Sequence, residues 1–237
     1  MKQYKAIFFD LDHTLWDFES NSRTAISELF VTHNLQNTGI PSAQEFIKIY
    51  KVVNAIMWDE YHRNLISKEQ LRYGRFERAL AHFGVQTREL AELLSVEYLQ
   101  ICPVKTLLFP GALNVLEQLK QNHSLHIITN GFKEVQYLKI KNSGLMPYFD
   151  HIHISEEIGF KKPEPEIFNY ACKQARAIAE ECIMVGDNLE TDIAGARNAN
   201  VDHIFFNPEK IEHNANVDLE ISHLEELLPV FDYIKSK

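Results

Sequence analysis

Residues 6–15 read Ala-Ile-Phe-Phe-Asp-Leu-Asp-His-Thr-Leu, an apolar run that ends in two carboxylates one residue apart. The apolar part is typical of a strand buried on both faces of a parallel sheet. Core packing does not explain Asp10 and Asp12 at this position, because removing a carboxylate from water costs free energy unless a cation or hydrogen bonds compensate for it. In open α/β sheets, ligands bind beyond the carboxyl ends of the strands. These residues alone therefore indicate either a metal-dependent site or an ordinary turn or helix cap.

The composition of the 237 residues is that of an ordinary globular protein, with 45% hydrophobic and 24% charged residues. Lys and Arg together number 24 against 33 Asp and Glu, which gives a net charge of −9. An acidic balance argues against a nucleic-acid duplex or an anionic membrane as partner. A small anionic substrate remains compatible with it if a metal or a few lysines supply local positive charge.

The cysteines Cys102, Cys172 and Cys182 lack the spacing of a zinc site or a redox pair, so we expect buried thiols in a reducing compartment. No apolar run approaches the roughly 18 residues of a transmembrane helix. Residues 1–4 run directly into the first expected strand, which leaves no room for a signal peptide. We therefore expect a cytoplasmic protein.

A helical region is expected between residues 17 and 104. Four segments carry apolar residues at three- and four-residue spacing, namely 18–34, 42–64, 67–83 and 87–101. Ser42, Ser67 and Thr87 are the expected N-caps, the first two in capping boxes, and Gly84 is placed to end the third helix. The pattern predicts a four-helix bundle.

Strands and helices alternate from residue 107 onward, which predicts a parallel sheet with right-handed crossovers. The expected strands are 125–129, 151–154, 182–185, 203–206 and an edge strand at 217–221. Helices are expected from residue 112 to about 121 and at 132–143, 165–175, 192–199 and 224–233. The first strand belongs to this pattern, so the fold class is α/β, with a core formed by residues 1–16 and 105–237. The bundle of residues 17–104 leaves the core directly after Asp12 and is placed to act as a cap.

Three polar clusters lie beyond the first strand, each placed at a strand end: Thr129-Asn130-Gly131, Lys161-Lys162-Pro163, and the stretch from Gly186 to Asp192. Each alone is compatible with a turn, a cap or a solvated loop. Because parallel strand ends converge, we expect all of them to meet Asp10 and Asp12.

Such a set suits metal-assisted phosphoryl transfer through an aspartate. One of the pair Asp10 and Asp12 would attack phosphorus, and the other would protonate the leaving oxygen and then activate water. Mg²⁺ held by carboxylates would bring nucleophile and substrate together. Lys162, Thr129 and free backbone N–H groups around residues 11–14 and 130 would hold the phosphoryl oxygens.

The sequence resembles the haloacid dehalogenase (HAD) superfamily, with Asp10-Leu11-Asp12-His13-Thr14 as its DxDxT motif and the three clusters as its later motifs. The resemblance implies a Rossmann-like core with a helical C1 cap, Asp10 as nucleophile and Asp12 as acid/base. It implies phosphate contacts through Thr129 and Lys162, with Asn130 and Gly131 beside them in the substrate site. The implied cofactor is Mg²⁺, held by Asp10, the backbone carbonyl of Asp12, Asp187, and Asp192 nearby or through water.

A narrower resemblance points to the pyrimidine nucleotide 5′-nucleotidases of this superfamily. It is carried mainly by Asp10–Asp17, Val53-Asn54, Gly74-Arg75-Phe76 and Ile154–Glu157; Asn64, where a Gly is expected, departs from it. The subgroup acts on nucleoside monophosphates such as UMP, dUMP and dTMP. A mutase or phosphatase acting on sugar phosphates and a haloacid dehalogenase remain alternatives.

Cap residues are expected to select the substrate. Asn54 and Arg75 are candidates because a buried amide or guanidinium needs partners, and Trp16 could stack on a base. Trp58, Tyr61 and Phe76 fit the bundle core better, and the histidines are interpreted as surface or linker residues. We expect a small phosphorylated substrate as partner, no nucleic acid or membrane, and a monomer or homodimer.

Overall fold

A computed structural model describes residues 3–232 of the chain. It divides into two compact units, one containing the described residues up to Phe18 and from Thr106 onward, the other Glu19–Lys105. The division predicted from the sequence lay at residues 16/17 and 104/105. No helix among the described residues is long and apolar enough to cross a membrane.

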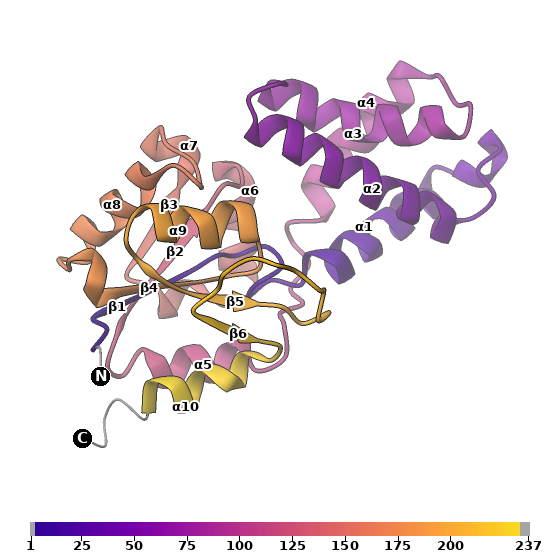
Figure 1. The fold of residues 1–237 in the computed structure, drawn as a ribbon. Coiled ribbons are helices and arrows are strands. Elements are labelled where there is room, and N and C mark those ends of the chain that lie inside the picture. The colour runs from indigo at the N-terminus through magenta and orange to yellow at the C-terminus, as the bar shows by residue number, and fades with distance from the viewer. Residues whose placement is uncertain (1–2, 233–237) are drawn as a thin grey trace. The chain divides into compact units, whose positions relative to one another are not determined.

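The first unit is built on a six-stranded, fully parallel sheet in the order β3-β2-β1-β4-β5-β6 (Figure 1). This is the predicted α/β fold class. β1 lies inside the sheet, between β2 and β4. The strands are β1 (Ala6–Phe9), β2 (Ser124–Thr129), β3 (His151–Ile154), β4 (Cys182–Gly186), β5 (Asp202–Phe206) and β6 (Leu219–Ile221).

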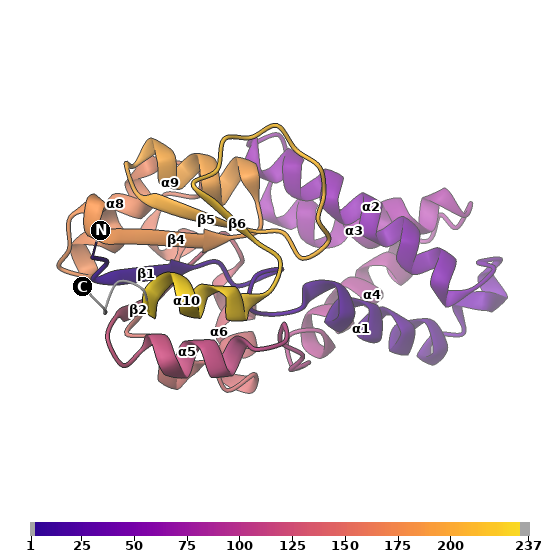
Figure 2. The same cartoon turned by 60° about the horizontal axis from the view of Figure 1, so that its bottom comes forward.

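Helices cover both faces of the sheet, with α8 and α9 on one face and α5, α6 and α10 on the other (Figure 2). Their bounds are α5 (Ala112–Leu119), α6 (Lys133–Asn142), α7 (Ser155–Ile158), α8 (Pro165–Gln174), α9 (Ala194–Asn198) and α10 (Leu227–Asp232). Beneath α8 and α9, Phe8, Ile128 and Met184 of the strands pack against Phe168. Burying β1 on both faces explains its continuous apolar run.

Two expected elements differ in detail. The predicted helix at 192–199 begins earlier, with a π-helical turn at Leu189–Ile193 that continues into α9. The short helix α7 follows β3 directly, so Lys162 lies beyond a helix and not at a strand end as predicted. Tyr233, the expected end of the last helix, lies outside the described residues.

The second unit contains the predicted helices, with α2 packed on α3 and α3 on α4. Their bounds are α1 (Phe18–Thr32), which starts at the unit boundary, α2 (Ala43–His62), α3 (Lys68–His82) and α4 (Arg88–Ile101), with a short 3₁₀ turn at Leu35–Thr38. Aromatic side chains fill the interior, where the Tyr50 and Phe76 ring centroids lie 4.7 Å apart.

The helix caps were predicted in part correctly. Ser67 forms the expected capping box with Gln70, and Ser42 accepts a hydrogen bond from the Glu45 N–H. Gly84 follows α3 with the positive φ of 79° expected of a C-cap. Thr87 occupies the predicted N-cap position of α4, although its side chain makes no capping hydrogen bond to that helix.

Histidine was misjudged from the sequence. His126, His153 and His203 are buried and not surface residues. His126 Nδ1 lies 2.9 Å from His153 Nε2, and His126 also contacts the Phe8 ring edge-on.

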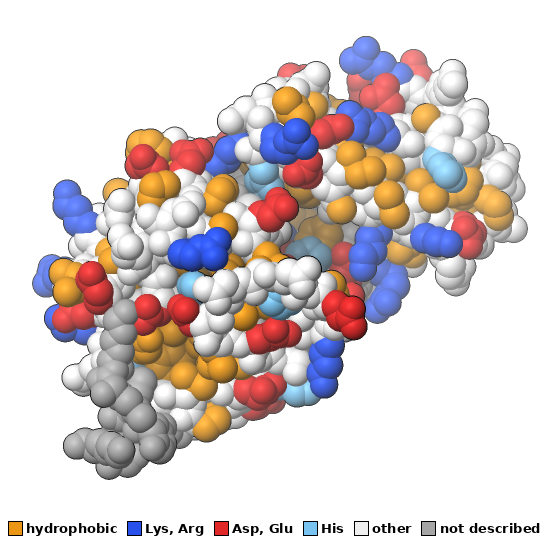
Figure 3. Space-filling view, viewed as in Figure 1, with side chains coloured by type: hydrophobic (Ala, Val, Ile, Leu, Met, Phe, Trp, Pro, Cys, Tyr) orange, Lys and Arg blue, Asp and Glu red, His pale blue; other side chains and the backbone are white. Residues whose placement is uncertain are grey.

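The three cysteines are free and buried, as expected. Charged side chains of both signs are interspersed over the face drawn in Figure 3.

Candidate active site

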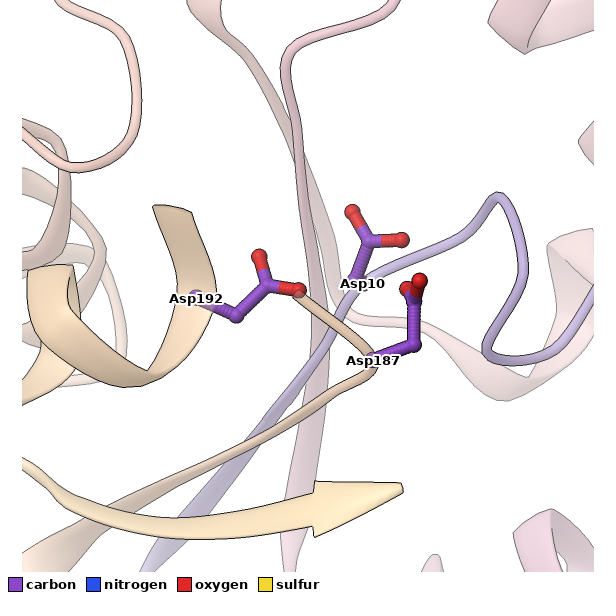
Figure 4. Close-up of side chains that lie close together, drawn as sticks. All are labelled: Asp10, Asp187 and Asp192. Carbon is purple, nitrogen blue, oxygen red and sulfur yellow. The ribbon is translucent and has the colours of Figure 1, made fainter. Parts of the chain in front are cut away.

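Three carboxylates converge at the carboxyl edge of the sheet (Figure 4). Asp10 follows β1, Asp187 follows β4, and Asp192 lies in the π-helical turn. One carboxylate oxygen of each lies within 4.8 Å of the others. β1 and β4 are neighbours in register, with Phe9 opposite Val185, which brings the residues that follow them together.

Lys162 is the counter-charge of this cluster. Its side chain is 2% exposed, and its Nζ contacts Asp10 Oδ1 and lies 2.6 Å from Asp192 Oδ1. Burial lowers the pKa of this lysine, but the two carboxylates outweigh it and hold the pKa above its usual value. The ammonium is therefore fixed beside Asp10 in its charged form.

Asn130 holds the Lys162 backbone. Its Nδ2 donates to the Lys162 carbonyl at 2.9 Å, and its Oδ1 accepts from the Lys162 N–H at 2.8 Å. The side chain predicted to touch substrate is thus engaged in positioning Lys162. Only the backbone of Asn130 remains as a candidate phosphate contact.

The cluster carries more negative charge than Lys162 neutralises. Burial raises the pKa of Asp10, and Asp192 and Asp187 raise it further; Lys162 offsets only part, so the net pKa lies well above the usual value. Burial and Asp192 raise the pKa of Asp187 to about 8, although Thr14 Oγ1 donates to Asp187 Oδ1 at 3.0 Å. Clustered carboxylate oxygens with surplus charge fit a hard divalent cation.

Asp12 is not part of the acidic cluster of Asp10, Asp187 and Asp192, and its carboxylate has a separate set of contacts. Lys139 Nζ donates to Asp12 Oδ1 at 2.6 Å, and Gln136 Nε2 donates to Oδ2 at 2.7 Å. Burial raises the pKa of Asp12, but the Lys139 charge and both hydrogen bonds outweigh it, and the net pKa lies below the usual value. The predicted metal contact of Asp12 concerned only its backbone carbonyl, so the side chain is available for another role.

Thr129 and Gly131 lie beside Asp12. Thr129 Oγ1 accepts from Gln136 Nε2 at 2.7 Å and from the Gly131 N–H at 3.1 Å. With two donors on its oxygen, the hydroxyl is left to donate its own hydrogen. A Cβ on Gly131 would lie 2.1 Å from Gln136 Nε2, so only glycine leaves room for that amide.

Trp16 does not present an open ring. It is fully buried, and Lys139 Nζ lies 4.4 Å from its ring centroid, which occupies one face. Base stacking on Trp16, expected from the sequence, therefore conflicts with this packing.

One of the backbone N–H groups expected to hold phosphoryl oxygens is also engaged within the chain. The His13 N–H donates to the Trp16 carbonyl at 3.0 Å.

Asn54 and Arg75 contact each other inside the helical unit. Arg75 Nη1 donates to Asn54 Oδ1 at 3.1 Å, and the guanidinium lies 5.5 Å from the centroid of the Tyr98 ring. Both side chains are buried. Their predicted contact with substrate stays a prediction.

The sequence reasoning missed Gln136 and Lys139 and the side-chain contact of Thr14 with Asp187. Gln136 and Lys139 had a signal, since they lie at positions i and i+3 of the helix predicted after Thr129 and share its buried face with Ile140. Two polar residues on the core side of a helix need buried partners, and Asp12 is that partner.

Comparison with known families agrees with this geometry. A family model described as haloacid dehalogenase-like hydrolase matches residues 4–200. The chain belongs to this family and is a hydrolase, as the motifs predicted.

Individual relatives cover nearly the whole chain. The HAD-hydrolase YfnB of Bacillus subtilis, solved bound to magnesium, superposes with a TM-score of 0.87 at 30% identity, covering 98% of this chain and 100% of that one. Pyrimidine 5′-nucleotidase YjjG of Escherichia coli is 35% identical, covering 94% of this chain and 96% of its own. Glyceraldehyde 3-phosphate phosphatase of Methanothermobacter thermautotrophicus is 31% identical, covering 88% of each chain.

Proposed function

We propose that the protein is a Mg²⁺-dependent phosphatase that hydrolyses phosphate monoesters through an aspartyl phosphate on Asp10. The observation that carries this proposal is that Asp10 and Asp12 have different surroundings. Asp10 lies among Asp187, Asp192 and Lys162, whereas the Asp12 side chain is held apart by Lys139 and Gln136. A reaction that needs a nucleophile and a separate proton-transfer group uses such a pair.

Asp10, Asp187, Asp192 and the Asp12 backbone carbonyl are the residues that would hold Mg²⁺. The bound ion would supply positive charge to a phosphoryl oxygen and offset the repulsion between the anionic nucleophile and the anionic substrate. Lys162 Nζ, beside Asp10, adds a second positive charge for the same oxygens. The Thr129 hydroxyl, with its hydrogen free to donate, suits another of them.

In the first step an Asp10 carboxylate oxygen bonds to phosphorus, and the bond from phosphorus to the leaving oxygen breaks. The electron pair stays on that oxygen, which takes a proton from Asp12. Lys139 keeps the resting Asp12 ionised, so Asp12 first takes this proton from the phosphoryl group of the substrate. A phosphate monoester has a second pKa of about 6 and retains the proton in part at neutral pH. In the second step Asp12 takes a proton from water, whose oxygen bonds to phosphorus as the bond from phosphorus to Asp10 breaks. Asp12 then returns to its ionised state by passing that proton to the departing phosphate.

The substrate class we favour is a pyrimidine nucleoside monophosphate such as UMP, dUMP or dTMP. The subgroup motifs and the relative named pyrimidine 5′-nucleotidase support it. A sugar phosphate is the second candidate, because another relative of similar identity is a glyceraldehyde 3-phosphate phosphatase. We further propose that the helical unit, Glu19–Lys105, acts as the cap that selects between them.

The test is phosphate release from a panel of nucleoside monophosphates, sugar phosphates and simple aryl phosphates, with Mg²⁺ and with EDTA. We expect Mg²⁺-dependent release and the highest kcat/KM on pyrimidine nucleotides. Turnover that persists in EDTA would refute the metal dependence. Sugar phosphates ranking above UMP, dUMP and dTMP would transfer the assignment to the second candidate.

A further inference from the structure

The Asp12 carboxyl is held by two side chains of α6. Each of its oxygens has its own donor, Lys139 Nζ on Oδ1 at 2.6 Å and Gln136 Nε2 on Oδ2 at 2.7 Å. Both donors are buried, whereas the Asp12 side chain keeps 23% of its surface exposed. The carboxyl is therefore fixed on its inner side and reachable on its outer side.

Lys139 is itself held in place. Its ammonium lies 4.4 Å from the Trp16 ring centroid and 5.5 Å from that of Phe18, in addition to its ion pair with Asp12. A buried lysine is rare unless paired, and an aromatic face lowers the cost of burying its charge. The two rings and the carboxylate leave the ammonium little freedom.

Gln136 links Asp12 to Thr129. Its Nε2 group uses one hydrogen on Asp12 Oδ2 and the other on Thr129 Oγ1, both at 2.7 Å. Gly131 makes this reach possible, since a Cβ there would overlap the amide at 2.1 Å. One amide thus sets the distance between the proton-transfer carboxyl and a proposed phosphate contact.

We propose that Gln136 and Lys139 are positioning residues that hold Asp12 for proton transfer to the leaving oxygen. This inference rests on the proposed phosphatase function and concerns the same site. The competing role, in which Lys139 binds the phosphoryl group directly, predicts a loss of substrate affinity. A merely structural role predicts equal losses on every substrate.

Two substrates that differ by one nitro group separate these roles. A p-nitrophenyl leaving group departs without much help from an acid, whereas the more basic phenyl leaving group needs a proton. In Lys139→Met and in Gln136→Met, we expect kcat for phenyl phosphate to fall on the order of 10²-fold, the lower end of what general acid catalysis contributes. We expect kcat for p-nitrophenyl phosphate to fall about 10-fold or less, with the KM of both substrates within about twofold of wild type.

The kcat ratio for the two substrates is measured in one preparation, so a smaller folded fraction cancels from it. Lys141→Met is the matched control, because Lys141 is exposed on the same helix and should leave the ratio unchanged. Equal losses on both substrates, or a loss expressed in KM, would overturn the inference. A wild-type protein that releases phosphate from neither ester, nor from any nucleoside monophosphate or sugar phosphate, would instead overturn the proposed function before any variant is compared.

Discussion

Replacing Asp187 by Asn should stabilise the metal-free protein at neutral pH and weaken its stabilisation by Mg²⁺. The pKa of about 8, against an ordinary value of 3.8, means that at pH 7 Asp187 is mostly protonated in the folded state but ionised in the unfolded state, which disfavours folding by about 4 kcal/mol. The side chain is only half-buried, so solvent screening reduces this to about 2 kcal/mol. Asn keeps an oxygen for the hydrogen bond from Thr14 and cannot ionise in either state.

The sign of the pH dependence follows from the raised pKa. Between the unfolded value near 4 and the folded value near 8, the folded state binds more protons than the unfolded state. Wild-type stability in EDTA should therefore fall with rising pH across this window. Relative to Asp187→Asn, we expect it to fall by about 1 kcal/mol between about pH 5.5 and about pH 7.5, half of this window.

Urea unfolding followed by circular dichroism measures this difference. Glu190→Gln is the matched control, since it removes an exposed carboxylate from the same segment. Saturating Mg²⁺ should raise the free energy of unfolding of the wild type and of the control, but much less that of Asp187→Asn. Parallel pH slopes for wild type and Asp187→Asn, or equal stabilisation of both by Mg²⁺, would refute the reasoning.

Three further changes test individual contacts. Gly131→Ala should displace the Gln136 amide and lower kcat on phenyl phosphate about 10-fold or more, with circular dichroism unchanged; full activity would show that the amide tolerates the methyl group. Burial lowers the pKa of His126 to about 4 and that of His153 to about 3, so stability present above pH 6.5 should be lost as pH falls toward these values. His126→Gln should make the unfolding free energy less acid-sensitive, by about 1–2 kcal/mol at about pH 5, and an unchanged slope would contradict this. Ser67→Ala should cost about 1 kcal/mol in urea unfolding through loss of the capping box, and a change below about 0.3 kcal/mol would argue against the cap.

The acidic cluster could be predicted from the sequence because it depends on strand ends. Asp10 and Asp187 each follow a short apolar strand, and parallel strands deliver their carboxyl ends to one edge whatever the intervening chain does. The family motifs then assigned the chemistry. The sheet and the helices were predicted for the same reason, since apolar periodicity reports which face of each element is buried.

The contacts around Asp12 could not be predicted in the same way. Lys139 and Gln136 are more than a hundred residues from Asp12, separated by 127 and 124 positions, and their approach depends on how α6 packs on the sheet. A helical pattern shows which face is buried, not which residue lies opposite. The buried pair His126 and His153 escaped notice because histidine has no strong preference for burial, and pairing across neighbouring strands leaves no local pattern.

The central claim is that Asp10 carries the phosphoryl group during turnover. The most direct measurement starts by rapidly mixing the protein with Mg²⁺ and a phosphate monoester that it hydrolyses. The reaction is quenched with acid, the acyl phosphate is reduced with borohydride, and the reduced residue is located by peptide mass spectrometry. We expect the reduced residue at Asp10, and no phosphate release by Asp10→Asn. Reduction at Asp187 or Asp192, or release with no trapped residue at Asp10, would contradict the account.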